Sequence, residues 1–281
     1  MKLPVSLLIA TASSLAMHPT LLAAVLVEEG FNCAPGSNLA GANGGTGFTD
    51  AWTGNANDYT VNAASLAYSG LATSGGSVSL VGNGSWSTSA KRNFASINTT
   101  TGVVWGSYLV RADVIGDDGF ELKYGEAGAG LNQGNINYGN ATGFGNGGGT
   151  ATRLDTNSNS GAVFGPTLVV GQTHLLVWAF NGSASEVNGI FPGDYIMFLD
   201  PTVGVDPDAG SPNIYKFAGA GPLGTLGITQ IFARNTTATV DEVRIGQSFA
   251  DVTPVPEPSA IAISALGLLA AAGVRRRKSG N

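Results

Sequence analysis

The 281-residue sequence is poor in the residues that most often carry chemistry. It contains one cysteine and two histidines, and only 11% of its residues are charged. A single cysteine excludes an internal disulfide, and the apolar content of 43% separates the chain from charge-rich disordered proteins. Lys+Arg 13 against Asp+Glu 19 gives a net charge of −6, which argues against a nucleic-acid partner because phosphate binding needs a basic face.

Long apolar runs are also absent between the two ends of the chain. The 42 glycines and 12 prolines make up about a fifth of the residues, which disfavours a mainly helical fold. The middle of the chain instead carries short apolar or alternating runs, separated by clusters of Gly, Asn, Asp and Ser. These runs, rich in β-branched and aromatic residues, predict strands at 78–81, 103–114, 120–124, 173–180, 195–199, 228–234 and 239–245.

Alternation within two of these runs indicates one buried face. In the run 103–114, Tyr108, Val110, Ala112 and Val114 fall on one side, and Arg111 and Asp113 fall on the other. The run 239–245 places Val243 and Ile245 opposite Glu242 and Arg244, which predicts a half-exposed strand. The simplest architecture that uses many such strands is an all-β, antiparallel two-sheet β-sandwich, and we expect it to occupy residues 25–253 as one domain.

The N-terminal residues 1–24 have the order of a secretory signal peptide. Lys2 precedes the apolar stretch Val5–Met17, which would span only about 20 Å as a helix, too short for a bilayer core. Small residues follow, so we expect cleavage near Ala24, with Ala16 as the alternative. Such a segment implies the Sec export machinery as a partner. The alternative is a buried helix of the fold.

The C-terminal residues 254–281 carry a second targeting pattern. The motif Pro256-Glu257-Pro258 is followed by the apolar segment Ser259–Val274 and by the cations Arg275, Arg276, Arg277 and Lys278. The prolines keep the backbone extended, and the apolar segment, about 24 Å long as a helix, is suited to a membrane. The cations hold the terminus on the cytoplasmic side, which leaves the body outside.

These C-terminal residues resemble the PEP-CTERM sorting signal part for part. The resemblance implies that a membrane-embedded exosortase recognises and processes the tail during export in a Gram-negative bacterium that makes exopolysaccharide. The protein would then be tethered to the membrane of the cell envelope before processing, and lie at the cell surface or in the extracellular matrix afterwards. An ordinary C-terminal membrane anchor is the alternative, and it also places the body outside the cytoplasm.

The middle of the chain is similar to LamG-like, concanavalin A-like jelly rolls of secreted bacterial proteins. The segments that carry this resemblance are Thr173–Phe180, Asp194–Pro201 and Asp241–Gly246, together with the opening Glu29–Phe31 and Gly47–Trp52. The roles of that family range from sugar binding to plain scaffolding, so the resemblance implies a fold and assigns no functional residue.

Catalytic patterns are scarce. His174 lies inside an apolar strand, where a hydrogen-bonded core histidine is expected rather than a general base, and Cys33 has no local histidine partner. Neither a G-x-S-x-G elbow nor the Glu-x-Asp-x-x-Glu pattern of retaining jelly-roll glucanases occurs. The densest acidic cluster is Asp117, Asp118, Glu121 and Glu126. Its segment Asp117-Asp118-Gly119 is a good turn between two strands, which is favoured over a catalytic role.

Two ligand types stay open. Calcium is the one metal considered, because Asp117-Asp118 and Asp206-Pro207-Asp208 place hard oxygen ligands in loops, although a solvated acidic loop is the default and no cofactor is otherwise predicted. Polysaccharide is the other, because aromatic rings in loops can stack on sugar faces. The loop aromatics are Trp52, Tyr59, Trp86 and Tyr138, with core packing as the alternative.

The sequence therefore predicts an exported, non-enzymatic envelope or matrix protein, sorted by an exosortase, that binds exopolysaccharide. The alternatives are a polysaccharide-active hydrolase or lyase on the same scaffold, and a purely structural matrix protein.

Overall fold

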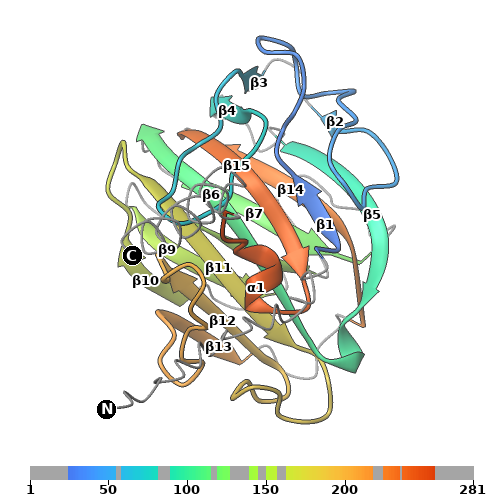
Figure 1. Ribbon diagram of the computed structural model, residues 1–281, viewed down its shortest axis with the longest axis vertical. Helices are drawn as coiled ribbons and strands as arrows, with labels where there is room; N and C mark the ends of the chain where they lie inside the picture. Colours follow the sequence, from blue (N-terminus) through green and yellow to red (C-terminus); the bar gives the residue numbers. More distant parts are fainter. Residues whose placement is uncertain are drawn as a thin grey trace, which may run out of the picture.

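The computed structural model describes residues 25–54, 58–81, 89–114, 119–126, 139–144, 150–156, 163–217, 224–234 and 236–256 (Figure 1). The signal peptide expected at 1–24 and the apolar segment and basic cluster of the tail lie outside these residues. In the described part of the chain, no helix is long and apolar enough to cross a bilayer.

The described strands form two antiparallel sheets, as expected for an all-β sandwich (Figure 1). The eight-stranded sheet has the order β13 (Ile214–Phe217), β12 (Asp194–Leu199), β11 (Thr173–Asn181), β6 (Val103–Val114), β15 (Thr237–Gly246), β4 (Ser77–Val81) and β3 (Tyr59–Asn62), with β1 (Val27–Glu29) also paired to β15. The seven-stranded sheet has the order β10 (Val163–Thr167), β9 (Ala151–Thr156), β8 (Gly139–Phe144), β7 (Gly119–Gly125), β14 (Thr225–Arg234), β5 (Ser89–Asn98) and β2 (Thr53–Gly54). The remaining elements are a 3₁₀ turn, η2 (Thr99–Thr101), and a one-turn helix, α1 (Phe249–Val252).

All seven predicted runs are strands in the structure, with ends that differ by no more than a few residues. The main core lies between the sheets, and Trp178 is among its largest fully buried side chains. Its indole lies over Gly106, the residue paired with it on β6, and a Cβ added there would lie 2.2 Å from the ring. Glycine is therefore required opposite this tryptophan, because any side chain would collide with the indole.

A second apolar cluster covers the outer face of the eight-stranded sheet. Leu109 and Trp105 of β6 belong to it, and Trp105 stacks on Phe198 with ring centroids 6.3 Å apart. Phe249 of α1 closes the cluster from outside, 5.8 Å from the Trp105 ring. The middle of β6 is therefore buried on both faces. The predicted alternation is seen at residues 111–113, where Ala112 is buried between the partly exposed Arg111 and Asp113. The expectation that Val114 faces the core is wrong, because this residue is 59% exposed.

The expectation that β15 is half-exposed is wrong. Glu242 and Arg244 are buried, because the loop after β3 covers this part of the strand. Ser74 of that loop donates its backbone N–H to Glu242, and Arg244 donates to the carbonyl of Ala72 (2.8 Å) and to Glu28 (3.0 Å). Charges that a regular strand would expose are thus satisfied inside the protein.

A buried ion pair joins the two sheets near the N-terminus. Arg92 of β5 lies 2.6 Å from the carboxylate of Glu29, which ends β1, and both side chains are almost fully buried. The same carboxylate accepts the indole N–H of Trp52 (2.9 Å) and the backbone N–H of Phe31 (2.9 Å). Arg92 also packs over the Phe48 ring, 4.0 Å from its centroid. The pair therefore fixes the long connection between β1 and β2 to both sheets.

The C-terminal end of the described chain is anchored on the eight-stranded sheet. Ser248 and Asp251 form a capping box at α1. Ser107 of β6 donates its hydroxyl to the carbonyl of Val252 (2.6 Å), and the Ala72 backbone N–H donates to the carbonyl of Pro254 (2.8 Å). The body is thus folded up to the residues where the predicted sorting tail begins.

Replacing Arg92 by methionine is expected to lower the free energy of unfolding by about 3 kcal/mol, because the buried Glu29 carboxylate loses its counter-charge. Urea unfolding measures the change. The matched control is Lys91→Met on the same strand, where the side chain is exposed and a change below about 0.5 kcal/mol is expected. Equal effects of the two substitutions would contradict the role given to the ion pair.

A second prediction concerns Asp241, which lies in a bulge of β15 and accepts the backbone N–H of Leu66 (2.7 Å) and the hydroxyl of Ser65. Burial raises the pKa of Asp241 to about 8, whereas an aspartate in an unfolded chain titrates near 4. Between pH 4 and 8, folding therefore takes up a proton at Asp241. The contribution of this group to the free energy of unfolding is fully present below pH 4 and is lost as the pH rises through 8.

The Asp241→Asn variant is expected to show a shallower decline of the free energy of unfolding between pH 4 and 8. Urea titrations at several pH values measure this slope. Asp208→Asn, which changes an exposed carboxylate, serves as the control and is expected to keep the slope of the parent protein. An unchanged slope in the Asp241 variant would show that Asp241 does not titrate as stated.

Candidate functional site

The structure corrects two of the four aromatic residues predicted to stack on sugars. Trp52 and Tyr59 are each 1% exposed, so neither ring has a face free for a ligand. Trp52 donates to Glu29, and the Tyr59 hydroxyl donates to the carbonyl of Ile231 (3.4 Å). Both residues belong to the core between the sheets. Trp52 is bonded to the buried Glu29 carboxylate, and Tyr59 lies in β3 with its side chain buried. Trp86 and Tyr138 lie outside the described residues.

Two of the four acidic residues considered as calcium ligands lie in the described part of the chain. Asp206 and Asp208 are exposed in the loop between β12 and β13, where Asp208 accepts the backbone N–H of Gly210 (2.9 Å). Across the described ranges, no group of three or more His, Cys, Asp or Glu side chains is placed to hold a metal. Asp117 and Asp118 lie outside those ranges, so calcium remains a sequence prediction.

Glu121 lies in a strand, within the predicted run 120–124. It lies in β7, and its carboxylate pairs with Lys123 (3.0 Å) and with Arg153 of β9 (2.7 Å). Lys123 also lies over the Phe232 ring, 4.6 Å from its centroid. These contacts join β7 to its neighbour β14 and, across β8, to β9. The Glu121 carboxylate is used in ion pairs.

His174 has a structural role, as the sequence indicated. Its Nε2 accepts the backbone N–H of Val169 (3.0 Å), which leaves the proton on Nδ1, 2.6 Å from the Asp200 carboxylate. Asp200 also accepts the backbone N–H of Leu175 (2.9 Å). Both ring nitrogens are therefore occupied in joining the loop before β11 to the end of β12.

Cys33 is a half-buried thiol without the features of a nucleophile. Burial raises the pKa of the Cys33 thiol, and the nearby Glu29 carboxylate raises it further. The thiolate is therefore disfavoured, and Cys33 acts as a small apolar side chain.

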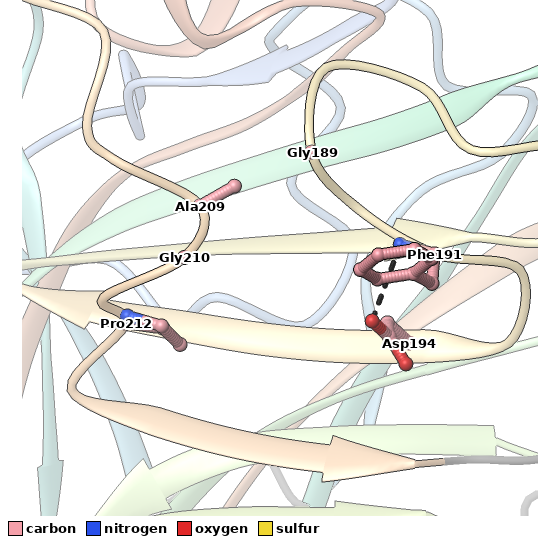
Figure 2. A pocket seen from close by; sticks show the side chains of 6 residues that line it. All are labelled: Gly189, Phe191, Asp194, Ala209, Gly210 and Pro212. Carbon is pink, nitrogen blue, oxygen red and sulfur yellow. Dashed lines mark hydrogen bonds between the residues drawn. The ribbon is translucent and has the colours of Figure 1, made fainter.

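A pocket of about 310 Å³ lies between the loops that flank β12 (Figure 2). The loop that joins β11 to β12 supplies Gly189 and Phe191, and Asp194 is the first residue of β12. The loop that joins β12 to β13 supplies Ala209, Gly210 and Pro212. Phe191 is 58% exposed, whereas the Asp194 residue is only 4% exposed. Figure 2 shows the ring and the carboxylate on one side of the pocket, with Ala209 and Pro212 on the other.

The position of Phe191 follows from a tight turn just before it. Val187 and Ile190 exchange two backbone hydrogen bonds (3.1 and 3.0 Å), and Asn188 and Gly189 between them have positive φ angles of 51° and 79°. Asn-Gly is the dipeptide that this kind of two-residue turn favours. Ile190 is buried in the outer apolar cluster, so the next residue, Phe191, points outward.

Two polar side chains fix the pocket loop. The Asn181 amide donates to the carbonyls of Ser185 (2.9 Å) and Ile190 (2.6 Å), and its oxygen accepts the Ser183 backbone N–H (3.0 Å). Asp194 accepts the backbone N–H of Phe191 (3.2 Å) and returns a bond from its own N–H to the Phe191 carbonyl (3.0 Å). An exposed ring and a carboxylate are thus held next to each other before any ligand binds.

The sequence alone predicts none of these residues as a binding site. The Asn188-Gly189 dipeptide is a readable turn signal, but the exposure of Phe191 depends on the outer cluster that draws Ile190 inward. The described pocket residues therefore replace Trp52 and Tyr59 as the candidate site for stacking.

Comparison with known proteins identifies the tail. Residues 254–278 match the family model described as the PEP-CTERM protein-sorting motif. The chain carries a PEP-CTERM sorting motif. The resemblance stated for Pro256, Glu257, Pro258 and the basic cluster is thereby confirmed; Pro256 is exposed at the end of the described chain, and Glu257, Pro258 and Arg275–Lys278 lie beyond it.

The comparisons say less about the body. No curated protein matches the chain. Similar solved structures include the T. cruzi calreticulin globular domain (14% identity, TM-score 0.49, 82% of this chain and 90% of that one) and lectin II from Ulex europaeus (12%, 0.48, 79% and 99%). A carbohydrate esterase of the Shiga toxin-encoding bacteriophage phi24B is also similar (12%, 0.44, 80% and 99%). At this level of likeness, these names assign no function to this chain.

Proposed function

We propose that this protein is exported by the Sec machinery, sorted through its PEP-CTERM motif by an exosortase, and binds polysaccharide of the envelope or matrix without catalysis. The sorting motif supports export to the cell envelope. The observation that carries the binding proposal is the pocket in which exposed Phe191 lies beside Asp194. Signal-peptide cleavage and a membrane-inserted tail are part of the proposal.

The pocket suits the chemistry of a sugar ring. The C–H face of a pyranose packs on an aromatic ring, and a carboxylate accepts hydrogen bonds from adjacent hydroxyls. Gly189 and Gly210 leave the backbone open to close approach. A volume of about 310 Å³ lies at the lower end of the range for small-molecule sites, which fits one sugar unit rather than a chain.

Charge favours a neutral sugar over an acidic one. Five of the 13 basic residues, Lys2 and Arg275–Lys278, lie in the two ends, so residues 25–253 carry a net charge of about −10. Asp194 adds a negative charge at the pocket itself. A neutral glycan avoids repulsion from both.

The lining of the pocket supports binding rather than hydrolysis. Glycosidases generally use two carboxyl groups that flank the scissile bond, and Asp194 is the one carboxylate among the six lining residues. The polysaccharide-active hydrolase or lyase and the purely structural matrix protein remain the competing functions. A concanavalin A-like jelly roll is the proposed class of the body, which the two antiparallel sheets support.

Phe191→Ala is expected to weaken binding to a neutral polysaccharide at least tenfold, because stacking on an aromatic ring is lost. Glycan-array screening followed by calorimetry on the best ligand measures the change. The matched control is Phe164→Ala, which removes another exposed phenylalanine (43%) from β10 and is expected to leave affinity unchanged.

The outcomes separate the competing functions. Equal affinity of the two phenylalanine variants would place the sugar elsewhere and overturn the pocket. Absence of binding to every glycan would favour the structural protein, and release of shortened glycan would favour the enzyme.

The sorting half of the proposal has its own test. Mass spectrometry of the mature protein is expected to show that residues after about Pro258 are missing, because the exosortase removes the tail. Deleting the exosortase is expected to leave the full-length form in the membrane. A released protein that still ends in Arg275–Lys278 would contradict this processing.

A further inference from the structure

The sorting motif begins inside the folded body. The motif match starts at residue 254, and the described chain continues to Pro256. Val252 and Thr253 are buried, and the Pro254 carbonyl accepts the Ala72 backbone N–H (2.8 Å). The point at which the tail leaves the body is therefore fixed on the outer face of the eight-stranded sheet.

The tether between that point and the apolar tail is short. Three residue steps separate Pro256 from Ser259, where the apolar segment begins, and they span at most about 10 Å. The headgroup layer on each side of a bilayer is about 5–7 Å thick. Once the segment Ser259–Val274 is inserted, the surface around Pro256 has to lie at the headgroups.

Two exposed valines lie at this exit point. Val255 is 56% exposed, and Val205, in the loop between β12 and β13, is 59% exposed. The loop that carries Val205 lies against Val255, because a Cβ added at the preceding Gly204 would lie 3.0 Å from Cγ2 of Val255. We call Val205 and Val255 the valine face.

We propose that the valine face rests on the lipid surface while the tail is still attached, so that the precursor has one fixed orientation on the membrane. This inference rests on the proposed insertion of the tail. The short tether brings the valine face to the headgroups, and the two apolar side chains enter the interface. Asp206 and Asp208 follow in the same loop, so contact with zwitterionic lipid is favoured over contact with anionic lipid.

A second exposed valine serves as a reference point away from the exit point. Ser107, which holds the C-terminal segment, lies five residues before Ala112 on β6, a distance of about 17 Å along the strand. Ala112 accepts the backbone N–H of Gly171 (2.8 Å), and the preceding Val170 is 50% exposed. Val170 is therefore a matched exposed valine near the C-terminal end of β6, away from the strand position that holds the tail.

The test places one environment-sensitive fluorophore at a time on the full-length chain in phosphatidylcholine vesicles. In a Cys33→Ser background, Val205→Cys and Val170→Cys each provide a single labelling site. We expect a blue-shifted emission and quenching by lipid-borne quenchers at residue 205, and an aqueous signal at residue 170. Inserting a flexible 12-residue Gly/Ser segment between Pro256 and Glu257 is expected to return residue 205 to the aqueous signal.

Flotation of the vesicles distinguishes the ways in which the inference fails. If the chain floats with the vesicles but residues 205 and 170 give the same signal, the orientation is wrong and tail insertion stands. If the longer linker leaves the residue 205 signal unchanged, the short tether does not keep the valine face at the lipid surface, and the inference is overturned. If the chain does not float, both membrane insertion and the orientation are wrong.

Discussion

The eight-stranded sheet is apolar on both faces, and the need to cover its outer face shapes the functional surface. The inner face packs against the seven-stranded sheet around Trp178, and the outer face carries Trp105, Leu109 and Phe198. Burying such side chains stabilises the fold by about 1.5–3 kcal/mol each. The loops and the one-turn helix that cover the outer face therefore contribute buried side chains to the second apolar cluster.

The pocket and the exit point of the tail both follow from this covering. The loop between β11 and β12 is held down by Ile190, and the next residue, Phe191, is left exposed beside Asp194. Helix α1 is held down by Phe249 and Val252, and the sorting motif leaves the body directly afterwards. One packing constraint thus connects the proposed binding site, the proposed membrane-facing surface and the fold.

The fold class could be predicted from the sequence because seven strands have clear apolar or alternating patterns. Other strands were hidden by their composition. In β5 an inward position is occupied by Arg92, whose charge breaks the apolar pattern and is neutralised only by Glu29, 63 residues away. Strand β8 is made of Gly, Asn, Ala, Thr and Phe, and it resembles the loops around it.

The tail was predictable and the candidate pocket was not, for a physical reason. The sorting signal is a local pattern of proline, apolar and basic residues, which is complete within 25 residues of sequence. The pocket depends on contacts between loops that are separated by a whole strand, and Trp52 and Tyr59 were drawn inward by partners far away in sequence. Composition around an aromatic residue does not reveal such partners.

The central claim is that the pocket beside Phe191 holds a neutral sugar. A crystal structure of the protein with a neutral oligosaccharide from its array hits tests it most directly. We predict a sugar ring stacked on Phe191 with a hydroxyl hydrogen-bonded to Asp194. An oligosaccharide bound elsewhere, with the pocket unoccupied, would contradict it.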